Sequence, residues 1–251
     1  MSGASTVVPA QASQWPLPAG SGLTHRGRVR EHNEDKILTD PSGQLWAVAD
    51  GMGGYQHGDV ASDVVIDCLE DFDDGHDPAA ALELQLVRAN AVLRQKTREP
   101  GMGPMGATVV ALYIDRALAH LAWAGDSRAY LLRRQRLRLL TRDHTVVQDL
   151  VDQGILSPEE AEVHPESHIV TRAVGGDDSI EVDHIALPLV QGDRLLLCSD
   201  GLPRCVYEQT MESILQAAAT PQDACTALVN EALANGAPDN VSVIVVDLQE
   251  A

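Results

Sequence analysis

Aspartates stand at the ends of apolar segments that are spread over most of the 251-residue chain. A carboxylate at the end of a buried strand costs free energy when it has no partner, and neighbouring carboxylates oppose each other's ionisation. A divalent cation removes both costs, and oxygen ligands without His or Cys suit Mg²⁺ or Mn²⁺. The candidate ligands, in chain order, are Asp50, Asp126, Asp200 and Asp239.

Each of these aspartates has a simpler explanation when it is considered alone. Asp-Gly and Asp-Asn pairs are common in turns, where the carboxylate bonds to nearby backbone, and three of the four aspartates stand in such pairs. Four sites of this kind in one chain favour a shared metal centre over four unrelated turns. Gly51, which follows Asp50, also permits a sharp turn and lets a backbone carbonyl approach an ion.

Arg30 ends the basic stretch THRGRVR at 24–30 and shortly precedes Glu34 and Asp35. A guanidinium beside a metal cluster can hold a phosphate dianion through two hydrogen bonds. The alternative is an ordinary surface charge, because arginines in basic stretches are usually exposed. Arg30 is therefore a candidate phosphate-binding residue whose role depends on where the fold places it.

Apolar segments and helical repeats supply the elements that must position these side chains. Several segments are apolar on both faces, which is typical of strands covered from both sides. The helical segments carry apolar residues at helical spacing or a capping box. The predicted strands are Gln44–Asp50, Thr108–Ile114, Ala117–Ala124, Arg128–Arg133, Asp193–Ser199 and Val241–Leu248. The predicted helices are Asp59–Phe72, Pro78–Arg98, one that begins at Ser157, and Pro221–Leu233.

This order of elements predicts an α+β fold, because strands and helices do not alternate regularly. The strands need two stacked sheets to cover one another, and the helices then cover the outer faces. We expect one domain at 21–250, after a flexible leader at 1–20 that is rich in Ser, Ala, Pro and Gly. Trp15 either pins this leader to the domain or is exposed.

The formal net charge of −19 argues against nucleic acid and anionic membranes as partners, because both would be repelled. The four cysteines lack the spacing of a zinc site, and three lie in apolar stretches as reduced thiols do, which favours the cytoplasm. We find neither the pattern of a secretory signal nor an apolar run of the roughly 18 residues that a membrane span requires.

Eight stretches occur together in the order found in one enzyme family, and they span roughly residues 22–248. They are GRVREHNED at 27–35, VADGMGGYQHGDVAS at 48–62, GAT at 106–108, WAGDSRAYLL at 123–132, LTRDHT at 140–145, IVTRAVGG at 169–176, LLLCSDGL at 195–202 and APDNVSVIVV at 237–246. On these residues the chain resembles the bacterial members of the metal-dependent PPM, or type 2C, protein phosphatases. The resemblance implies a central antiparallel β-sandwich flanked by helices on both sides, with a flap at about 142–185.

The resemblance also implies a ligand set for two or three Mn²⁺ or Mg²⁺ ions. Asp50 would bridge two ions, and the Gly51 carbonyl would bind the second. Asp200 and Asp239 would complete the protein ligands of the first ion. Asp126 would join Asp200 at a third, weaker site.

The same resemblance assigns the residues around the ions. Glu34 and Asp35 would hold metal-bound water, and Arg30 would grip the substrate phosphate. Two ions about 4 Å apart lower the pKa of a shared water, which then attacks phosphorus in line without a phosphoenzyme. The family therefore implies hydrolysis of phosphoserine and phosphothreonine in proteins.

The chain departs from the family pattern at the residue that follows DGMGG. Many relatives carry a histidine there that is a candidate general acid, whereas this chain has Tyr55 and places a histidine two residues later, at His57. Either His57 takes this role or water supplies the proton. The flap sequence Glu166-Ser167-His168 is less basic than in many relatives, which leaves substrate preference open.

Two other functions remain to be weighed against an active phosphatase. A catalytically weak or dead phosphatase-like scaffold would bind phosphoproteins, but it should have lost metal ligands that this chain retains. A metal-dependent phosphodiesterase or nuclease would need a basic groove and stacking aromatics, which the acidic composition argues against. The expected partners are phosphorylated proteins, especially a Ser/Thr kinase and its substrates, and we expect a monomer.

Overall fold

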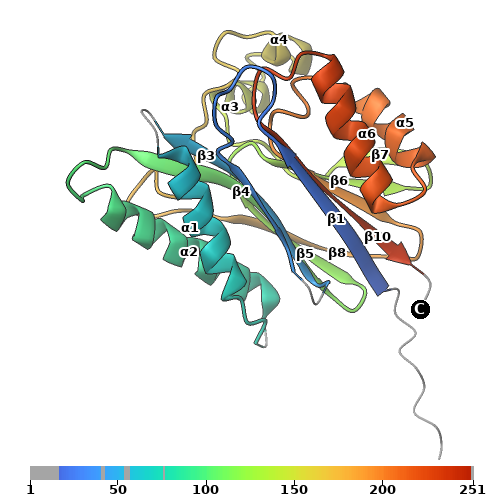
Figure 1. Cartoon of the computed structure of the whole chain (residues 1–251), viewed down its shortest axis with the longest axis horizontal. Coiled ribbons are helices and arrows are strands. Elements are labelled where there is room, and N and C mark those ends of the chain that lie inside the picture. Colours follow the sequence, from blue (N-terminus) through green and yellow to red (C-terminus); the bar gives the residue numbers. More distant parts are fainter. Residues whose placement is uncertain (1–16, 41–42, 54–56, 76, 250–251) are drawn as a thin grey trace, which may run out of the picture.

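Two five-stranded antiparallel sheets pack face to face in the computed structural model (Figure 1), which describes residues 17–40, 43–53, 57–75 and 77–249. The first sheet has the order β1 (Leu17–His25), β10 (Val241–Gln249), β9 (Arg194–Cys198), β6 (Arg128–Arg133) and β7 (Arg136–Leu139). The second has the order β2 (Asp35–Thr39), β3 (Leu45–Gly53), β4 (Met105–Asp115), β5 (Leu118–Ala124) and β8 (Asp183–Pro188).

Strand β4 shows why the central strands are apolar on both faces. Val110 and Leu112 point into the core between the two sheets, whereas Val109 and Ala111 join the core under the helices. Because successive side chains of a strand point to opposite faces, a strand between two apolar layers needs apolar residues at every position. The sandwich is thus the middle of a four-layer arrangement.

The helices cover the outer faces of both sheets, as Figure 1 shows. Helices α1 (Gly58–Glu70) and α2 (Pro78–Lys96) pack on the second sheet, and α5 (Glu208–Ala217) and α6 (Pro221–Ala234) pack on the first. The short helices α3 (Val146–Asp152) and α4 (Pro158–Glu162) lie between β7 and β8, at the end of the sandwich where β1 runs into β2.

The predicted α+β antiparallel sandwich with helices on both sides is confirmed, and all six predicted strands and four predicted helices are present. The capping box at Ser157 forms, because Ser157 Oγ accepts from Glu160 N while the Glu160 carboxylate accepts from Ser157 N. Six elements were not predicted from the sequence: β1, β2, β7, β8, α3 and α5.

The proposed leader at 1–20 is described only from Leu17 onward, and residues 17–20 form the start of β1 rather than a flexible segment. Residues 1–16, including Trp15, lie outside the described part of the chain. Within the described part, none of the helices has the length and apolar character that crossing a bilayer would take.

The intersheet core makes a direct prediction about stability. Leu121 of β5 is fully buried between the sheets, so we expect Leu121→Ala to lower the free energy of unfolding by about 2–5 kcal/mol, through lost apolar contacts and a residual cavity. Leu118→Ala on the same strand is the matched control, because Leu118 is 36% exposed. Urea denaturation measures both variants, and equal losses would contradict this assignment of the core.

Candidate metal centre

Strand register brings the predicted acidic residues to one end of the sandwich. In the second sheet, Asp35 at the start of β2 lies opposite Asp50 of β3. In the first sheet, the end of β9 meets the beginning of β10, where Ser199 N donates to Ser242 O at 3.0 Å. Asp200 follows Ser199 directly, and Asp239 stands just before β10.

Asp35 connects the two sheets. Its side chain is buried, and its Oδ2 accepts hydrogen bonds from Ser199 Oγ at 2.8 Å and from Ser242 Oγ at 2.7 Å. Its Oδ1 is also buried but has no hydrogen-bond partner among the described residues. A buried carboxylate oxygen without a donor is costly, so this atom marks a place that favours a cation or an ordered water.

Burial and mutual repulsion raise the pKa values of the acidic groups. Burial, together with the charges of Asp200 and Asp239, raises the pKa of Asp35 to about 7, although the two serine hydroxyls oppose this shift. Burial and the charge of Asp35 raise the pKa of Asp50 well above its usual range, with further contributions from Asp200, Asp126 and Asp239. Several acidic groups that oppose one another's ionisation thus lie within electrostatic reach of Asp50.

Asp200 and Asp126 belong to the same cluster. Burial raises the pKa of Asp200, while Arg204 and a side-chain hydrogen bond with Asp50 lower it. Burial and the charge of Asp200 raise the pKa of Asp126 to about 7. A hydrogen bond between two carboxyl groups requires that one of them carries a proton, which is a sign of excess negative charge.

Arg30 contacts the cluster through Asp239, although its side chain is 54% exposed. Its Nε lies 2.8 Å from Asp239 Oδ1, and its Nη2 donates to Oδ2 at 2.9 Å. This planar two-point contact has the geometry that a guanidinium also uses on a phosphate. The sequence placed Arg30 beside the acidic residues, but it did not indicate that Asp239 itself would be the partner.

Backbone packing explains the glycine after Asp50. Gly51 N donates to Glu34 O at 3.2 Å, and a Cβ on Gly51 would overlap the carbonyl oxygen of Gly58. A Cβ on Gly58 would in turn lie 2.7 Å from Glu34 Oε1. These contacts hold the Glu34 side chain, the Gly51 backbone and the start of α1 close together, so no larger side chain fits at either glycine.

Asn240 organises the loop that carries Arg30 and Glu34. Its Nδ2 donates to Arg26 O and to His32 O, both at 2.9 Å, and its Oδ1 accepts from Glu34 N at 2.8 Å. One side chain thereby ties the beginning of β10 to the β1–β2 loop. The Asp239-Asn240 pair was visible in the sequence, but this role was not, because the partners are more than 200 positions away.

Asp126 lies in the turn between β5 and β6 and is linked to the flap. The residue before it, Gly125, accepts from His144 N at 2.9 Å and donates its own N–H to His144 Nδ1 at 3.0 Å. Gly125 has φ +114°, and a Cβ there would overlap Thr108, so this turn requires glycine. The first residues of the flap segment are therefore anchored directly beside Asp126.

His57, the candidate general acid, is the N-cap residue of α1, and its side chain makes no capping hydrogen bond. It is half-buried. Tyr55, which stands where many relatives have a histidine, lies outside the described residues. The role of His57 stays a hypothesis.

The chemistry of the donor set fits divalent cations, although the ligands are not yet arranged around an ion. Carboxylates converge on one place, and a buried carboxylate oxygen there lacks a donor. Nevertheless, in the part of the chain that the structure describes, no three His, Cys, Asp or Glu side chains are positioned to share one ion. The predicted ligands are therefore neighbours at this end of the sandwich.

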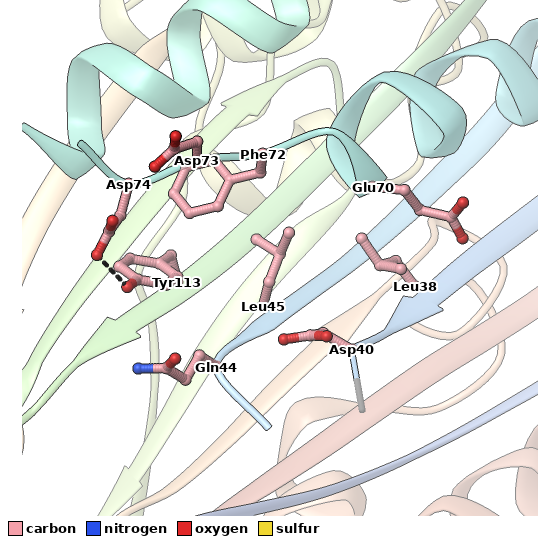
Figure 2. Close-up of a pocket in the computed structure, with 9 residues that line it drawn as sticks. All are labelled: Leu38, Asp40, Gln44, Leu45, Glu70, Phe72, Asp73, Asp74 and Tyr113. Carbon is pink, nitrogen blue, oxygen red and sulfur yellow. Dashed lines mark hydrogen bonds between the residues drawn. The ribbon is translucent and has the colours of Figure 1, made fainter. Parts of the chain in front are cut away.

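A separate surface hollow of about 730 Å³ lies at the other ends of β3 and β4. Figure 2 shows Leu45 and Tyr113 in this hollow, with Tyr113 Oη donating to Asp74 Oδ2 at 2.7 Å. Leu45 pairs with Tyr113, whereas Asp50 pairs with Thr108 five positions further along the same ladder. The acidic cluster is therefore not part of this hollow, which contains none of the predicted site residues.

Comparison with known proteins identifies relatives of the whole domain. The family model of protein phosphatase 2C matches residues 20–150. The serine/threonine phosphatase Stp of Listeria welshimeri is 37% identical over 238 residues, which cover 89% of this chain and 93% of that protein.

Solved structures agree with this match. The serine/threonine phosphatase PstP/Ppp of Mycobacterium tuberculosis superposes with a TM-score of 0.87 at 38% identity, covering 93% of this chain and 99% of that one. The catalytic domain of PstP in complex with two manganese ions superposes with a TM-score of 0.85 at 37% identity, with the same coverage.

The raised pKa of Asp35 predicts a measurable dependence of stability on pH in metal-free protein. The folded Asp35 keeps its proton up to pH about 7, whereas the unfolded chain releases it near ~4. Between these values the native state binds more protons, so this group lowers the free energy of unfolding as pH rises, by up to about 4 kcal/mol. Asp35→Asn should therefore gain stability relative to the wild type from pH 4 to 7 and keep that gain above pH 7.

Denaturation in the presence of a chelator at several pH values measures this difference. Asp178→Asn is the control, because the exposed Asp178 bonds to Arg94, which lowers the pKa of its carboxyl. Its effect should be small and of opposite sign, since a lowered pKa adds stability above the unfolded value. A stability difference for Asp35→Asn that does not change with pH would contradict the raised pKa assigned to this carboxyl group.

Proposed function

Because this chain belongs to the protein phosphatase 2C family, we propose that its acidic cluster is the metal centre of a protein serine/threonine phosphatase. The enzyme class is that of the relatives: a metal-dependent hydrolase of phosphoserine and phosphothreonine in proteins. The observation that carries the assignment of the site is the convergence of Asp35, Asp126, Asp200 and Asp239 on Asp50.

The proposed ligands follow the positions of these groups. Asp50 lies within electrostatic reach of every other aspartate of the cluster and is suited to bridge two ions, with the Gly51 carbonyl on the second. Asp200 and Asp239 complete the first ion's ligands. Asp126, which is influenced most by Asp200 among its charged neighbours, contributes to a third site with it.

Glu34 and Asp35 are proposed to orient water beside the ions rather than to bind them. The buried Oδ1 of Asp35 is available to accept from such a water, while its Oδ2 is committed to the two serines. The backbone of Glu34 is fixed at both its N–H and its carbonyl, which leaves its carboxylate next to Gly58. Both residues therefore have fixed positions at the edge of the cluster.

When bound, Mn²⁺ or Mg²⁺ ions supply Lewis acidity and lower the pKa of a water that serves as nucleophile. Arg30 binds the phosphate oxygens through its two-point fork and stabilises the charge that develops on them. To do so, Arg30 exchanges its contact with Asp239 for one with the substrate. The leaving alkoxide takes its proton from His57 or from water.

The alternative of a dead scaffold is not favoured, since every acidic position of the proposed ligand set is retained and the relatives are phosphatases. Phosphoproteins are the substrate class, and we propose a Ser/Thr kinase and its targets as physiological partners. The monomeric state, the cytoplasmic location and the absence of nucleic-acid and membrane partners stay predictions.

Loss of one proposed ligand tests the metal centre. We expect Asp239→Asn or Asp200→Asn to lower Mn²⁺-dependent hydrolysis of a phosphothreonine peptide by at least about 100-fold, because a neutral amide binds a hard cation far more weakly than a carboxylate does. Asp178→Asn is the matched control, because it removes an exposed carboxylate that pairs with Arg94 and not with a residue of the cluster. Turnover near that of the wild type in either ligand variant would refute the assignment.

Replacing Arg30 separates phosphate binding from chemistry. We expect Arg30→Ala to raise KM about 10-fold with a smaller change in kcat, since the guanidinium mainly binds the phosphate. Arg30→Lys should restore part of the loss, because it keeps the charge without the fork. Steady-state kinetics with a phosphopeptide measure KM and kcat of both variants. Unchanged values would show that Arg30 pairs with Asp239 but does not bind the substrate phosphate.

A further inference from the structure

Arg204 is an arginine of the site that the family resemblance did not assign. It lies in the turn after β9, where its backbone N–H donates to Asp200 O at 3.2 Å. Its Nη2 forms a close ion pair with Asp200 Oδ2, and its Nη1 lies 3.4 Å from Asp239 Oδ2. One guanidinium therefore bridges two of the proposed ligands of the first ion.

Both carboxylate oxygens of Asp239 are already in contact with N–H donors in this arrangement. Its Oδ1 accepts from Asn240 N at 2.9 Å and lies 2.8 Å from Arg30 Nε in an ion pair. Its Oδ2 accepts from Arg30 Nη2 at 2.9 Å and from Arg204 Nη1 at 3.4 Å. An ionised carboxylate has about four acceptor sites, and three of them accept hydrogen bonds here, two from arginines.

The donors around Asp239 differ in how readily they can leave. The Asn240 N–H belongs to the backbone at the start of β10 and is held by the side-chain bonds of that residue. Arg30 has a proposed use elsewhere, on the substrate phosphate. The Arg204 side chain is 38% exposed, and its ion pairs among the described residues are with these two carboxylates, so it can swing into solvent.

We propose that Arg204 is an internal competitor for the metal site, which lowers the affinity of the first ion by holding Asp200 and Asp239 in ion pairs. The inference rests on the proposed function, because it requires that these two aspartates are ligands. A cation and a guanidinium cannot occupy the same lone pairs, so the ion binds only the fraction of molecules in which Arg204 has withdrawn. The apparent dissociation constant rises as that fraction falls.

Arg204 pairs with two carboxylates of a crowded acidic cluster and offsets part of their negative charge. Arg204 thereby stabilises the metal-free protein, and the same contacts oppose metal entry. Removing Arg204 should free Asp200 Oδ2 and one contact of Asp239 Oδ2, while Arg30 keeps its own contact with Asp239.

The test is a titration of Mn²⁺ into metal-free protein by calorimetry, compared between the wild type, Arg204→Gln and Arg142→Gln. The control is matched because Arg142 is 39% exposed and also bridges two carboxylates, those of Asp149 and Asp152, outside the cluster. Both substitutions change the net charge equally. We expect the Mn²⁺ dissociation constant to fall about tenfold in Arg204→Gln and to change less than about twofold in Arg142→Gln.

A dissociation constant that is unchanged or raised in Arg204→Gln overturns the inference. If that variant does not fold, Arg204→Lys is measured instead. A lysine lacks the two-nitrogen fork that contacts Asp200 and Asp239 separately, so affinity should still increase, though by less, and no increase again overturns the inference. Asp239→Asn distinguishes a failure of the proposed metal centre from a failure of the proposed role of Arg204. If it leaves Mn²⁺ binding intact, the proposed metal centre is wrong; if it abolishes binding while Arg204→Gln has no effect, only the role of Arg204 fails.

Discussion

Crowding of negative charge at the junction of two sheets is the constraint on which the rest of this structure depends. Asp35 lies in one sheet and accepts hydrogen bonds from Ser199 and Ser242 of the other side, so the joint between the sheets is itself a carboxylate. Burial raises the pKa of Asp35, and the surrounding aspartates add to this. Such a cluster is stable only with compensating cations, whether arginines or metal ions.

The sandwich can contain this acidic cluster because burial of its apolar cores stabilises the fold and offsets the unfavourable free energy of the crowded carboxylates. Apolar cores lie between the sheets and under each pair of helices. The site itself consists of strand ends and short turns held by specific bonds, among them those of Asn240 to the β1–β2 loop. His144 adds a connection from the beginning of the flap to the turn before Asp126.

The strands that the sequence predicted are those covered on both sides, where continuous apolar runs are required. Strand β1 was missed because its sequence, LPAGSGLTH, has the composition of a loop. Its glycines have a tertiary reason: a Cβ at Gly20 would overlap the indole of Trp46, and one at Gly22 would lie 2.8 Å from Ile37. Local propensity cannot show that a neighbouring strand needs this space.

The sequence by itself determined which chemical groups are available: aspartates at strand ends, a glycine after Asp50, and an arginine near them. These follow from local patterns, since residue type and the end of an apolar run are both visible in the chain. Only the tertiary structure decided the partners, placing Arg30 and Arg204 on Asp239 and two serines on Asp35. The reason is physical: these contacts join residues that are distant in sequence, and strand register, which no local pattern encodes, sets which of them meet.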